Sequence, residues 1–447
     1  MPGGDRDQSH SSAVYHVRRI DFPLDAVVVV PGSKSIANRA LICATLATGI
    51  STLRNVPGGD DTVAMIDCVA SLGAGVGEHH ENPAVVDVHG TNGALRGGPM
   101  VLNTRLAGTT SRFVTALCAL GSGHYEIDGH GPLRARPMGA LHDALTALGV
   151  QLQPGGGWGH LPVTVTGLAG GPTGPAMARG EPRTVRMSGG VSSQYISALM
   201  MIGPYLGGLR IELTTPLVSR PYVAITAAVM ASFGVRDVTI LPSTVVVPSG
   251  RYLACDYTIE PDASSASYPL AAAAVCGGVV TVPDLGTHSL QGDAAFADVL
   301  ASMGCLVTRG PHGTGVKRVG PLVGVQVNMA DMSDLVPSLA IVAPFATTPT
   351  EITGVGFIRA KESDRLGDLA GELRKCGIDA TELADGVRIQ PGVTHGAGLE
   401  THHDHRLAMA FAVLGLRVPD IRVHDPDVVS KSWPDFWMML ELLRGPQ

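Results

Sequence analysis

One pattern of apolar residues recurs six times along this chain and constrains its fold more than any other feature of the sequence. In the first copy, Val69 and Leu72 lie four and seven positions after Met65, and Gly73 follows directly. This spacing predicts one apolar face of a helix, and a glycine just after it is typical of a helix C-cap. Two copies, in the middle and at the end of the chain, are weaker. The glycines that close the copies are Gly73, Gly149, Gly234, Gly304, Gly377 and Gly445.

Each copy belongs to a larger unit. A short strand-like run precedes the helix, and an apolar helix-like run precedes that strand. These units are longer than the repeats of a solenoid, which favours compact subdomains. We therefore expect two globules of three units each. The segment 151–185, rich in Gly and Pro, is expected to be a loose connector around one strand. The strand-like runs are 51–56, 124–128, 209–214, 279–282, 350–353 and 421–424, and the helix-like runs are 39–47, 112–120, 195–205, 268–275, 335–345 and 406–414.

Composition excludes several functional classes. A net charge of −7 and 4% aromatic residues argue against a broad basic surface for nucleic acid or anionic membranes. The longest apolar stretches fall short of the ~20 residues that a membrane-spanning helix needs, and residues 1–19 hold no apolar segment typical of a secretory signal. The seven cysteines show no CxxC spacing, which favours free thiols in a reducing cytosol. We therefore expect a soluble cytoplasmic protein without nucleic-acid or membrane partners.

The unusual polar residues lie at the junctions that lead into helices. Lysine is scarce, yet Lys34, Lys361 and Lys431 all lie at such junctions. Helix N-termini bind anions because their N–H groups are unpaired and the helix dipole is positive there. If the junctions converge, one cleft holds a cation cluster suited to small polyanions, with Asp334 and Glu362 as candidate proton-transfer groups. The basic residues at these junctions are Lys34, Arg39, Arg136, Arg220, Lys361, Arg365, Arg406 and Lys431.

Each junction taken alone also has a simpler interpretation. Hydroxyl side chains such as Ser35 and Thr109 could cap helices without binding any ligand. Lys361, Glu362 and Arg365 span one helical turn and could form a ladder of surface ion pairs. The recurrence of such residues at one structural position favours the anion site over these separate explanations.

The run His402–His405 has the composition of a metal cluster. Adjacent side chains point in different directions, however, and the run lacks the His-x3-His spacing of a helical metal site. We therefore expect no metal here. No flavin or nicotinamide motif is evident either, so no cofactor is expected.

Taken in order, the junction motifs resemble the signatures of the 5-enolpyruvylshikimate-3-phosphate synthase family of enolpyruvyl transferases. The similarity spans residues 15–440, and several motifs are long and jointly specific. It implies transfer of the enolpyruvyl group of phosphoenolpyruvate to the 5-hydroxyl of shikimate 3-phosphate, with release of phosphate, in the shikimate pathway to chorismate. The motifs are PGSKSIANRA, LAGTTSRF, ARP, VSSQY, VSRPY, DASSASY, AKESDRL, HDHRLAMA and SKSWPDF.

The resemblance also implies a fold of the α/β class. The family has two domains, each an inside-out α/β barrel of three βαβαββ units, which agrees with the six units found in the sequence. One domain is expected to span residues 32–259 and the other residues 15–31 with 260–447, while residues 1–14 form a flexible N-terminus. The chain would cross between the domains near Val30–Gly32 and Ile259–Asp262, and the domains would close over the substrates. The family is usually monomeric, so a monomer is expected.

The roles of the family's site residues carry over by position. Lys34 is implied to act at the bridging oxygen, Asp334 as the base for the acceptor hydroxyl, and Glu362 as the acid and base at C3. The residues implied to bind phosphoenolpyruvate are Lys34, Gly108, Thr109, Arg136, Gln194, Arg365, Arg406 and Lys431. Those implied to bind the acceptor are Ser35, Arg39, Ser192, Ser193, Gln194, Ser219 and Lys361.

Four residues depart from those common in the family: Leu106, Phe113, Pro132 and Phe357. Phe357 stands at a usually polar position near the acceptor phosphate, so it leaves the identity of the acceptor open. One alternative is an enolpyruvyl transferase that acts on a UDP-sugar or a nucleotide. Another is an inactive anion-binding homologue, against which the presence of all three proton-transfer residues argues.

Overall fold

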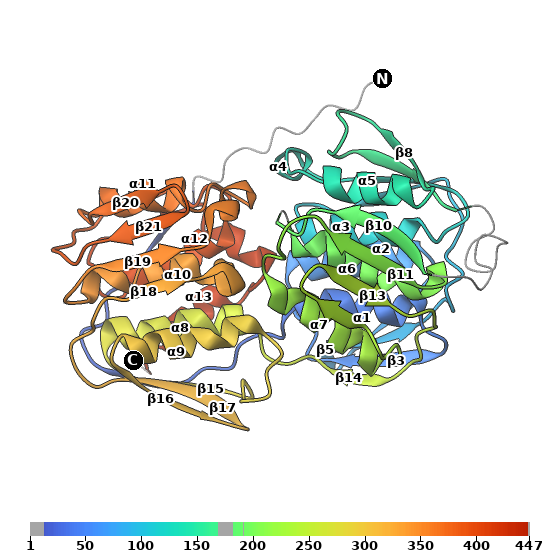
Figure 1. Cartoon of the computed structure of the whole chain (residues 1–447). Helices are drawn as coiled ribbons and strands as arrows, with labels where there is room; N and C mark the ends of the chain where they lie inside the picture. Colours follow the sequence, from blue (N-terminus) through green and yellow to red (C-terminus); the bar gives the residue numbers. More distant parts are fainter. Residues whose placement is uncertain (1–12, 169–181, 191, 446–447) are drawn as a thin grey trace, which may run out of the picture.

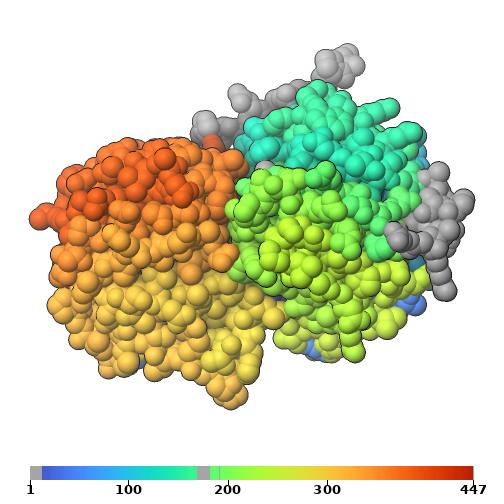
Figure 2. Space-filling view, viewed as in Figure 1, coloured from blue at the N-terminus to red at the C-terminus, as the bar shows by residue number. Residues whose placement is uncertain are grey.

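The computed structural model describes residues 13–168, 182–190 and 192–445, which form two α/β bodies side by side (Figure 1). Each body has its own hydrophobic core. The first core is built from residues between 36 and 259, and the second from residues 17–30 together with residues between 263 and 443. The two bodies touch directly in the space-filling view (Figure 2). Residues 1–12, where a flexible N-terminus is expected, lie outside the described residues.

In the described part of the chain, six small sheets form the outer layer, and five of them share one strand order. In each of the five, a central strand pairs in parallel with one neighbour and antiparallel with a hairpin. Burial alternates along strands such as β11, so one face of the sheet is solvated. In the first body the sheets are β14 (Asp256–Thr258), β3 (Ile50–Arg54), β5 (Asn82–His89), β4 (Gly75–His79); β6 (Met100–Asn103), β7 (His124–Asp128), β9 (Val163–Thr166), β8 (Gln151–Pro154); and β10 (Arg183–Met187), β11 (Leu209–Leu213), β13 (Thr244–Val247), β12 (Thr239–Leu241).

The second body repeats this arrangement, except that its last sheet lacks the hairpin. This three-stranded sheet pairs the N-terminal β1 with β23, which lies near the other end of the chain. The sheets are β16 (Cys305–Gly310), β17 (Gly313–Arg318), β15 (Gly278–Pro283), β2 (Leu24–Val27); β18 (Gln326–Asn328), β19 (Thr350–Thr353), β21 (Gly386–Ile389), β20 (Ala380–Leu383); and β1 (Val14–His16), β23 (Arg422–His424), β22 (Gly398–Leu399).

The recurring apolar pattern forms one helix in every unit, as the sequence predicts. The glycine that closes each copy has a positive φ, from 74° at Gly445 to 107° at Gly73. A side chain would be strained in this conformation, which explains why glycine recurs at each helix end. These helices are α2 (Asp60–Ser71), α5 (Gly139–Ala147), α7 (Arg220–Ser232), α9 (Phe296–Ser302), α11 (Gly367–Lys375) and α13 (Phe436–Leu442).

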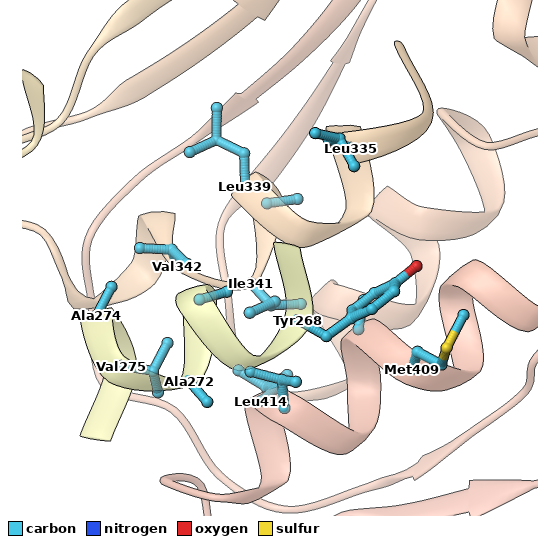
Figure 3. Packing of buried hydrophobic residues seen from close by; sticks show 14 of the residues in the cluster. Tyr268, Ala272, Ala274, Val275, Leu335, Leu339, Ile341, Val342, Met409 and Leu414 are labelled. Carbon is cyan, nitrogen blue, oxygen red and sulfur yellow. The ribbon is translucent and has the colours of Figure 1, made fainter. Parts of the chain in front are cut away.

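A second set of helices forms the interior of each body. Every residue of α1 from Ile36 onward is buried, and α8 is buried from Ala263 to Val275. A helix that is buried all round must be enclosed by other elements, which places the sheets outside. Figure 3 shows this packing in the second body, where Tyr268 of α8 lies close to Ile341 and to α12. The interior helices are α1 (Lys34–Leu46), α3 (Gly108–Cys118), α6 (Ser193–Ile202), α8 (Ala263–Cys276), α10 (Val336–Ala340) and α12 (His405–Gly415).

The chain passes between the bodies twice, and the two passages pair with each other. Gly32 and Pro261 form an isolated antiparallel bridge, and Asp262 N donates to Pro31 O at 2.8 Å. Before the first passage β2 joins a sheet of the second body, and before the second passage β14 joins a sheet of the first. The passages are therefore short and held by backbone hydrogen bonds.

In the connector 151–185, the described residues form more strands than the single one expected. Its described part contributes β8, β9 and the start of β10, and the turn between β8 and β9 holds the glycines at 155–157 and 159. Residues 169–181 of this segment lie outside the described residues. Among the described residues, no helix is both long and apolar enough to cross a membrane. The remaining short helices are α4 (Gly131–Arg134), η3 (Gly203–Leu206), η4 (Gly292–Ala295), η5 (Ala330–Leu335), η6 (Ala343–Phe345), η7 (Gly356–Ala360) and η8 (Pro426–Lys431).

The paired passages give a test of the fold. A Cβ on Gly32 would lie 1.8 Å from the Asn55 carbonyl oxygen, so Gly32→Ala forces the backbone apart. We expect it to lower the free energy of unfolding by about 3 kcal/mol in urea titrations. Gly320→Ala is the matched control, because a Cβ there meets nothing within 4 Å. Equal stability of the two variants would contradict the close approach of the first passage to the Asn55 carbonyl.

Candidate active site

One cavity lies between the two bodies and collects the junction residues. The starts of α1, α3, α6 and α7 line it from the first body, and the segment before α10, residues 357–365 and the start of α12 line it from the second. Lys431 is not among the lining residues, but its Nζ lies 3.5 Å from Glu362 Oε1. The sequence-predicted residues that line the cavity are Lys34, Ser35, Arg39, Gly108, Thr109, Arg136, Ser192, Ser193, Gln194, Ser219, Asp334, Lys361, Glu362, Arg365 and Arg406.

Helix starts supply the cavity with backbone donors and with close approach. A Cβ on Gly108 would lie 2.6 Å from Nη1 of both Arg112 and Arg136, so the glycine leaves room for both guanidinium groups beside the start of α3. Ser192 caps α6 by accepting a hydrogen bond from Gln194 N at 3.3 Å. The other N–H groups of these first turns add partial positive charge to the cavity.

Asp334 lies among three cations. Its Oδ1 accepts from Lys361 Nζ at 2.5 Å and from Arg365 Nη1 at 2.8 Å, and its Oδ2 accepts from Arg406 Nη2 at 2.7 Å. Burial raises the pKa of this carboxyl, but the charges of Arg406, Lys361 and Arg365 outweigh burial and hold the pKa well below its usual range. Without ligands, Asp334 is therefore a carboxylate and a weak base.

Glu362 has a similar environment, which extends across both bodies. Its Oε1 accepts from Arg136 Nη1 at 3.1 Å and from Lys431 Nζ at 3.5 Å, and its Oε2 accepts from Arg365 Nη2 at 2.8 Å. Burial raises the pKa of Glu362, but the charges of Arg136, Arg365 and Lys431 outweigh burial and hold the pKa well below the usual value. The pair Arg136–Glu362 also joins the first body to the second.

Arg365 organises the second body's side of the cavity. Its side chain is 1% exposed, and Nε donates to Asp404 Oδ2 at 2.6 Å while the terminal nitrogens reach Asp334 and Glu362. Burial lowers the pKa of this guanidinium, but the charges of Asp404, Glu362 and Asp334 outweigh burial and raise it. One arginine thus positions both candidate proton-transfer groups.

Lys34 and Arg39 both line the cavity from α1. Lys34 Nζ donates to Asp61 Oδ2 at 2.8 Å, and Asp61 is nearly fully buried at the start of α2. Arg39 donates to Ser35 O and to neighbouring oxygens of α6 and α7, which occupies four of its five N–H groups. Burial lowers the pKa of Arg39 to about 10. Arg39 keeps one N–H group for a ligand.

Comparison with known proteins identifies the family of this chain. A protein-family model described as EPSP synthase (3-phosphoshikimate 1-carboxyvinyltransferase) matches residues 19–440. The chain belongs to the EPSP synthase family. A 3-phosphoshikimate 1-carboxyvinyltransferase from Nostoc sp. (strain PCC 7120) is 43% identical over 424 residues, which cover 94% of this chain and 96% of the relative. One from Methanosphaerula palustris is 39% identical over 423 residues, with the same coverage of both chains.

The fold of the EPSP synthase family is also present in solved structures. An EPSP synthase structure from Acinetobacter baumannii superimposes with a TM-score of 0.80 and 24% sequence identity, and the match covers 96% of this chain and 98% of that one. The two-domain α/β fold expected from the sequence is therefore confirmed.

Sequence reasoning missed several residues of this cavity. Asp61, Arg112 and Tyr222 line the cavity, and His405 lines it beside Asp404. Asp61 is the second residue of α2, and an acid in the first turn of a helix is common for its effect on the helix dipole alone. Tyr222 follows Ser219 by one helical turn, and this spacing was the available signal for it.

The structure corrects two of the simpler interpretations of the junctions, together with the expectation that Arg220 joins the cation cluster. Lys361, Glu362 and Arg365 are not on a helical turn, because η7 ends before them and α11 begins after them, and their ion pairs are largely buried instead of forming a surface ladder. Arg220 is exposed and does not line the cavity. Thr109 does not cap α3, because Ala107 holds the cap position.

The run His402–His405 diverges as its sequence suggests. His402 Nε2 lies 2.8 Å from Glu372, whereas His403 Nδ1 lies 3.4 Å from Asp425. Among the residues that the structure describes, no group of His, Cys, Asp and Glu has the arrangement of a metal site.

The residues that depart from the family pattern have different surroundings. Phe357 lines the cavity, with its ring centre 5.7 Å from Lys361 Nζ. The carbonyl of Leu106 accepts from Lys431 Nζ at 3.1 Å, so that position contributes through its backbone. Pro132 is exposed in α4, outside the residues that line the cavity, and Phe113 is buried beneath the Arg39 guanidinium.

The depressed carboxylate pKa values predict loss of stability in acid. A folded-state pKa below the usual value stabilises the protein above pH ~4, and this stabilisation is lost as the pH falls. Glu362→Gln removes one such group, so its unfolding free energy should fall less steeply between about pH 5 and about pH 3, by up to about 1.4 kcal/mol per pH unit.

Urea unfolding at a series of pH values measures this slope. The exposed Glu81 provides a matched control, because Glu81→Gln should keep the wild-type slope. A Glu362→Gln slope equal to that of the wild type would contradict the charge environment described for Glu362.

Proposed function

We propose that this chain transfers the enolpyruvyl group of phosphoenolpyruvate to the 5-hydroxyl of shikimate 3-phosphate and releases phosphate. One observation carries the proposal: cations and helix starts from both bodies meet two carboxylates, Asp334 and Glu362, in one cavity. Such a cavity suits two anionic substrates and two proton transfers. Membership of the EPSP synthase family supports the same reaction.

Phosphoenolpyruvate carries a phosphate and a carboxylate, so its binding requires several cations. The cavity offers four cations for it, namely Lys34, Arg136, Arg365 and Arg406. A fifth, Lys431, contacts Glu362. Backbone N–H groups at the start of α3, at Gly108 and Thr109, add donors without a further charge, and Gln194 Nε2 lies 3.3 Å from Thr109 Oγ1. Gln194 would therefore lie between the two substrates.

The acceptor would bind on the opposite side of Gln194. Ser35 and the free N–H of Arg39 are suited to its carboxylate. Ser192, Ser193 and Ser219 form a hydroxyl cluster at the starts of α6 and α7, which suits its phosphate, with Lys361 as the nearby cation.

Substrate binding would change the protonation of the two carboxylates. In the free protein, Asp334 and Glu362 occupy the cations that the substrate anions need. When a phosphate or carboxylate takes those cations, each protein carboxylate loses part of its stabilisation and its pKa rises. The site would thus convert two weak bases into proton-transfer groups only when it is occupied.

The reaction then follows in two steps. Asp334 removes the proton of the acceptor hydroxyl as its oxygen attacks C2, while Glu362 gives a proton to C3, which yields a tetrahedral ketal. Lys34 neutralises or protonates the bridging oxygen, the C–O bond to phosphate breaks, and C3 returns its proton to Glu362. The products are the enolpyruvyl ether and phosphate.

We further propose the domain bounds 32–259 and 15–31 with 260–447, which place the paired passages at the hinge. We also propose a cytoplasmic monomer. One chain supplies both sides of the cavity, and the seven cysteines are free, which favours a reducing compartment.

The assignment of the base predicts a large loss of turnover in one variant. Asp334→Asn keeps the shape of the side chain and removes its basicity, so kcat should fall roughly 10²–10⁴-fold. Asp331→Asn in the same short helix is the control, because Asp331 is exposed and should keep wild-type turnover. Near wild-type turnover of Asp334→Asn would remove Asp334 from the role of base.

The proposed reaction is tested by phosphate release from phosphoenolpyruvate with shikimate 3-phosphate, uridine monophosphate or UDP-N-acetylglucosamine. We expect release only with shikimate 3-phosphate, and none without an acceptor. Release only with another acceptor would support enolpyruvyl transfer but would contradict shikimate 3-phosphate as the acceptor. No release with any acceptor would contradict the proposed function and favour an inactive anion-binding protein.

A further inference from the structure

Asp293 is a buried carboxyl group next to the cavity that the proposed chemistry does not use. It lies in η4, in the second body, and only 4% of it is exposed. Its Oδ2 accepts from Ser264 Oγ in a short hydrogen bond and from Tyr222 Oη at 3.5 Å. Its Oδ1 is buried and has no hydrogen-bond partner among the described residues. The Tyr222 contact crosses between the two bodies.

The charged groups around Asp293 do not neutralise it. Arg406, on α12, forms an ion pair with Asp334 at 2.7 Å. On the side of Asp293, its Nη2 donates to Ser264 Oγ at 3.4 Å and forms no ion pair with Asp293 itself. Asp262, at the start of α8, caps that helix through Ser265 N. Asp334 itself is a further negative charge nearby. No ion pair of Asp293 is found in the described part of the chain.

A buried carboxylate with an unpartnered oxygen and no cation is unfavourable, and a proton relieves it. Burial raises the pKa of Asp293 to about 6, and the charge of Asp334 contributes in the same direction. A further anion in the cavity would strengthen the preference for the protonated form.

Tyr222 connects this carboxyl to the proposed acceptor side. It lines the cavity one helical turn after Ser219, and its phenol has one hydrogen to donate. An ionised Asp293 accepts that hydrogen, which leaves only lone pairs for a ligand. A protonated Asp293 instead donates to Oη, and the phenol hydrogen is then free.

We propose that Asp293 takes up a proton from solvent when the anionic acceptor binds, so that its carboxyl donates to Tyr222 Oη and turns the phenol hydrogen toward an acceptor oxygen. This rests on the function proposed above. Asp293 is a positioning residue in this scheme, since it acts through Tyr222. The contact of 3.5 Å shortens in the complex, as site hydrogen bonds commonly do.

The first test needs no ligand. A folded-state pKa above the usual value of 3.8 stabilises the protein in acid, and that stabilisation is lost as the pH rises through about 6. Asp293→Asn cannot ionise, so its Tm relative to that of the wild type should increase from pH ~4 to pH ~7. Asp298→Asn, at a mostly exposed position on the next helix, should leave the pH dependence unchanged. A pH-independent difference between wild type and Asp293→Asn would overturn the proposal.

The second test measures proton uptake when shikimate 3-phosphate binds, by calorimetry at pH ~7 in buffers of different ionisation enthalpy. The wild type should take up almost one proton more than Asp293→Asn, and its Kd should rise more steeply with pH, by up to about tenfold per pH unit. Asp293→Leu, which cannot donate, should bind more weakly than Asp293→Asn at every pH.

The outcomes separate this inference from the proposed function. If shikimate 3-phosphate does not bind to the wild type, the proposed function fails and this inference fails with it. If it binds with equal proton uptake in the wild type and in Asp293→Asn, only this inference is overturned. If Asp293→Leu binds as tightly as Asp293→Asn, no hydrogen bond from residue 293 positions Tyr222.

Discussion

The structure depends on a simple constraint: its interior helices are buried on every side. Helices such as α1 and α8 have no exposed face, so sheets and amphipathic helices must enclose them. Their sides mostly face other apolar side chains, so the polar groups that reach the cavity come mainly from their starts, with the buried Arg39 of α1 as an exception. The starts of α1, α3, α6 and α12 all contribute to one cavity between the bodies. The anion site therefore follows from how the core is packed.

The free site balances its charge internally. Arg365 binds Asp334, Glu362 and Asp404 at once, and Arg136 reaches Glu362 from the other body. Buried cations without partners would be costly, so the carboxylates stabilise the unoccupied cavity. Substrate anions would displace these contacts and release the carboxylates for proton transfer. In this way the same ion pairs would hold the cavity together and restrain its chemistry until ligands arrive.

Much of the fold and of the site could be predicted from the sequence because the evidence is local and repeated. The apolar spacing before Gly73 and Gly377 indicated two helices that end at these glycines. Both glycines have the positive φ that is typical of a helix C-cap. Residues such as Lys34 and Arg406 were found because they stand at helix starts. Asp61 and Asp293 were not found, because an acid near a helix start has an ordinary local explanation. Only their burial and their partners distinguish them.

The sequence by itself determined the six units, their helices and strands, and which residues stand at the helix starts. It did so because periodicity, glycine caps and motif order are properties of neighbouring residues. Only the tertiary structure decided which residues meet. Glu362 and Arg136 are far apart in the chain, and their contact exists because two bodies joined by paired passages face each other. The protonation state of each group depends on its burial and on nearby charges, and both are set only when the two bodies form the cavity.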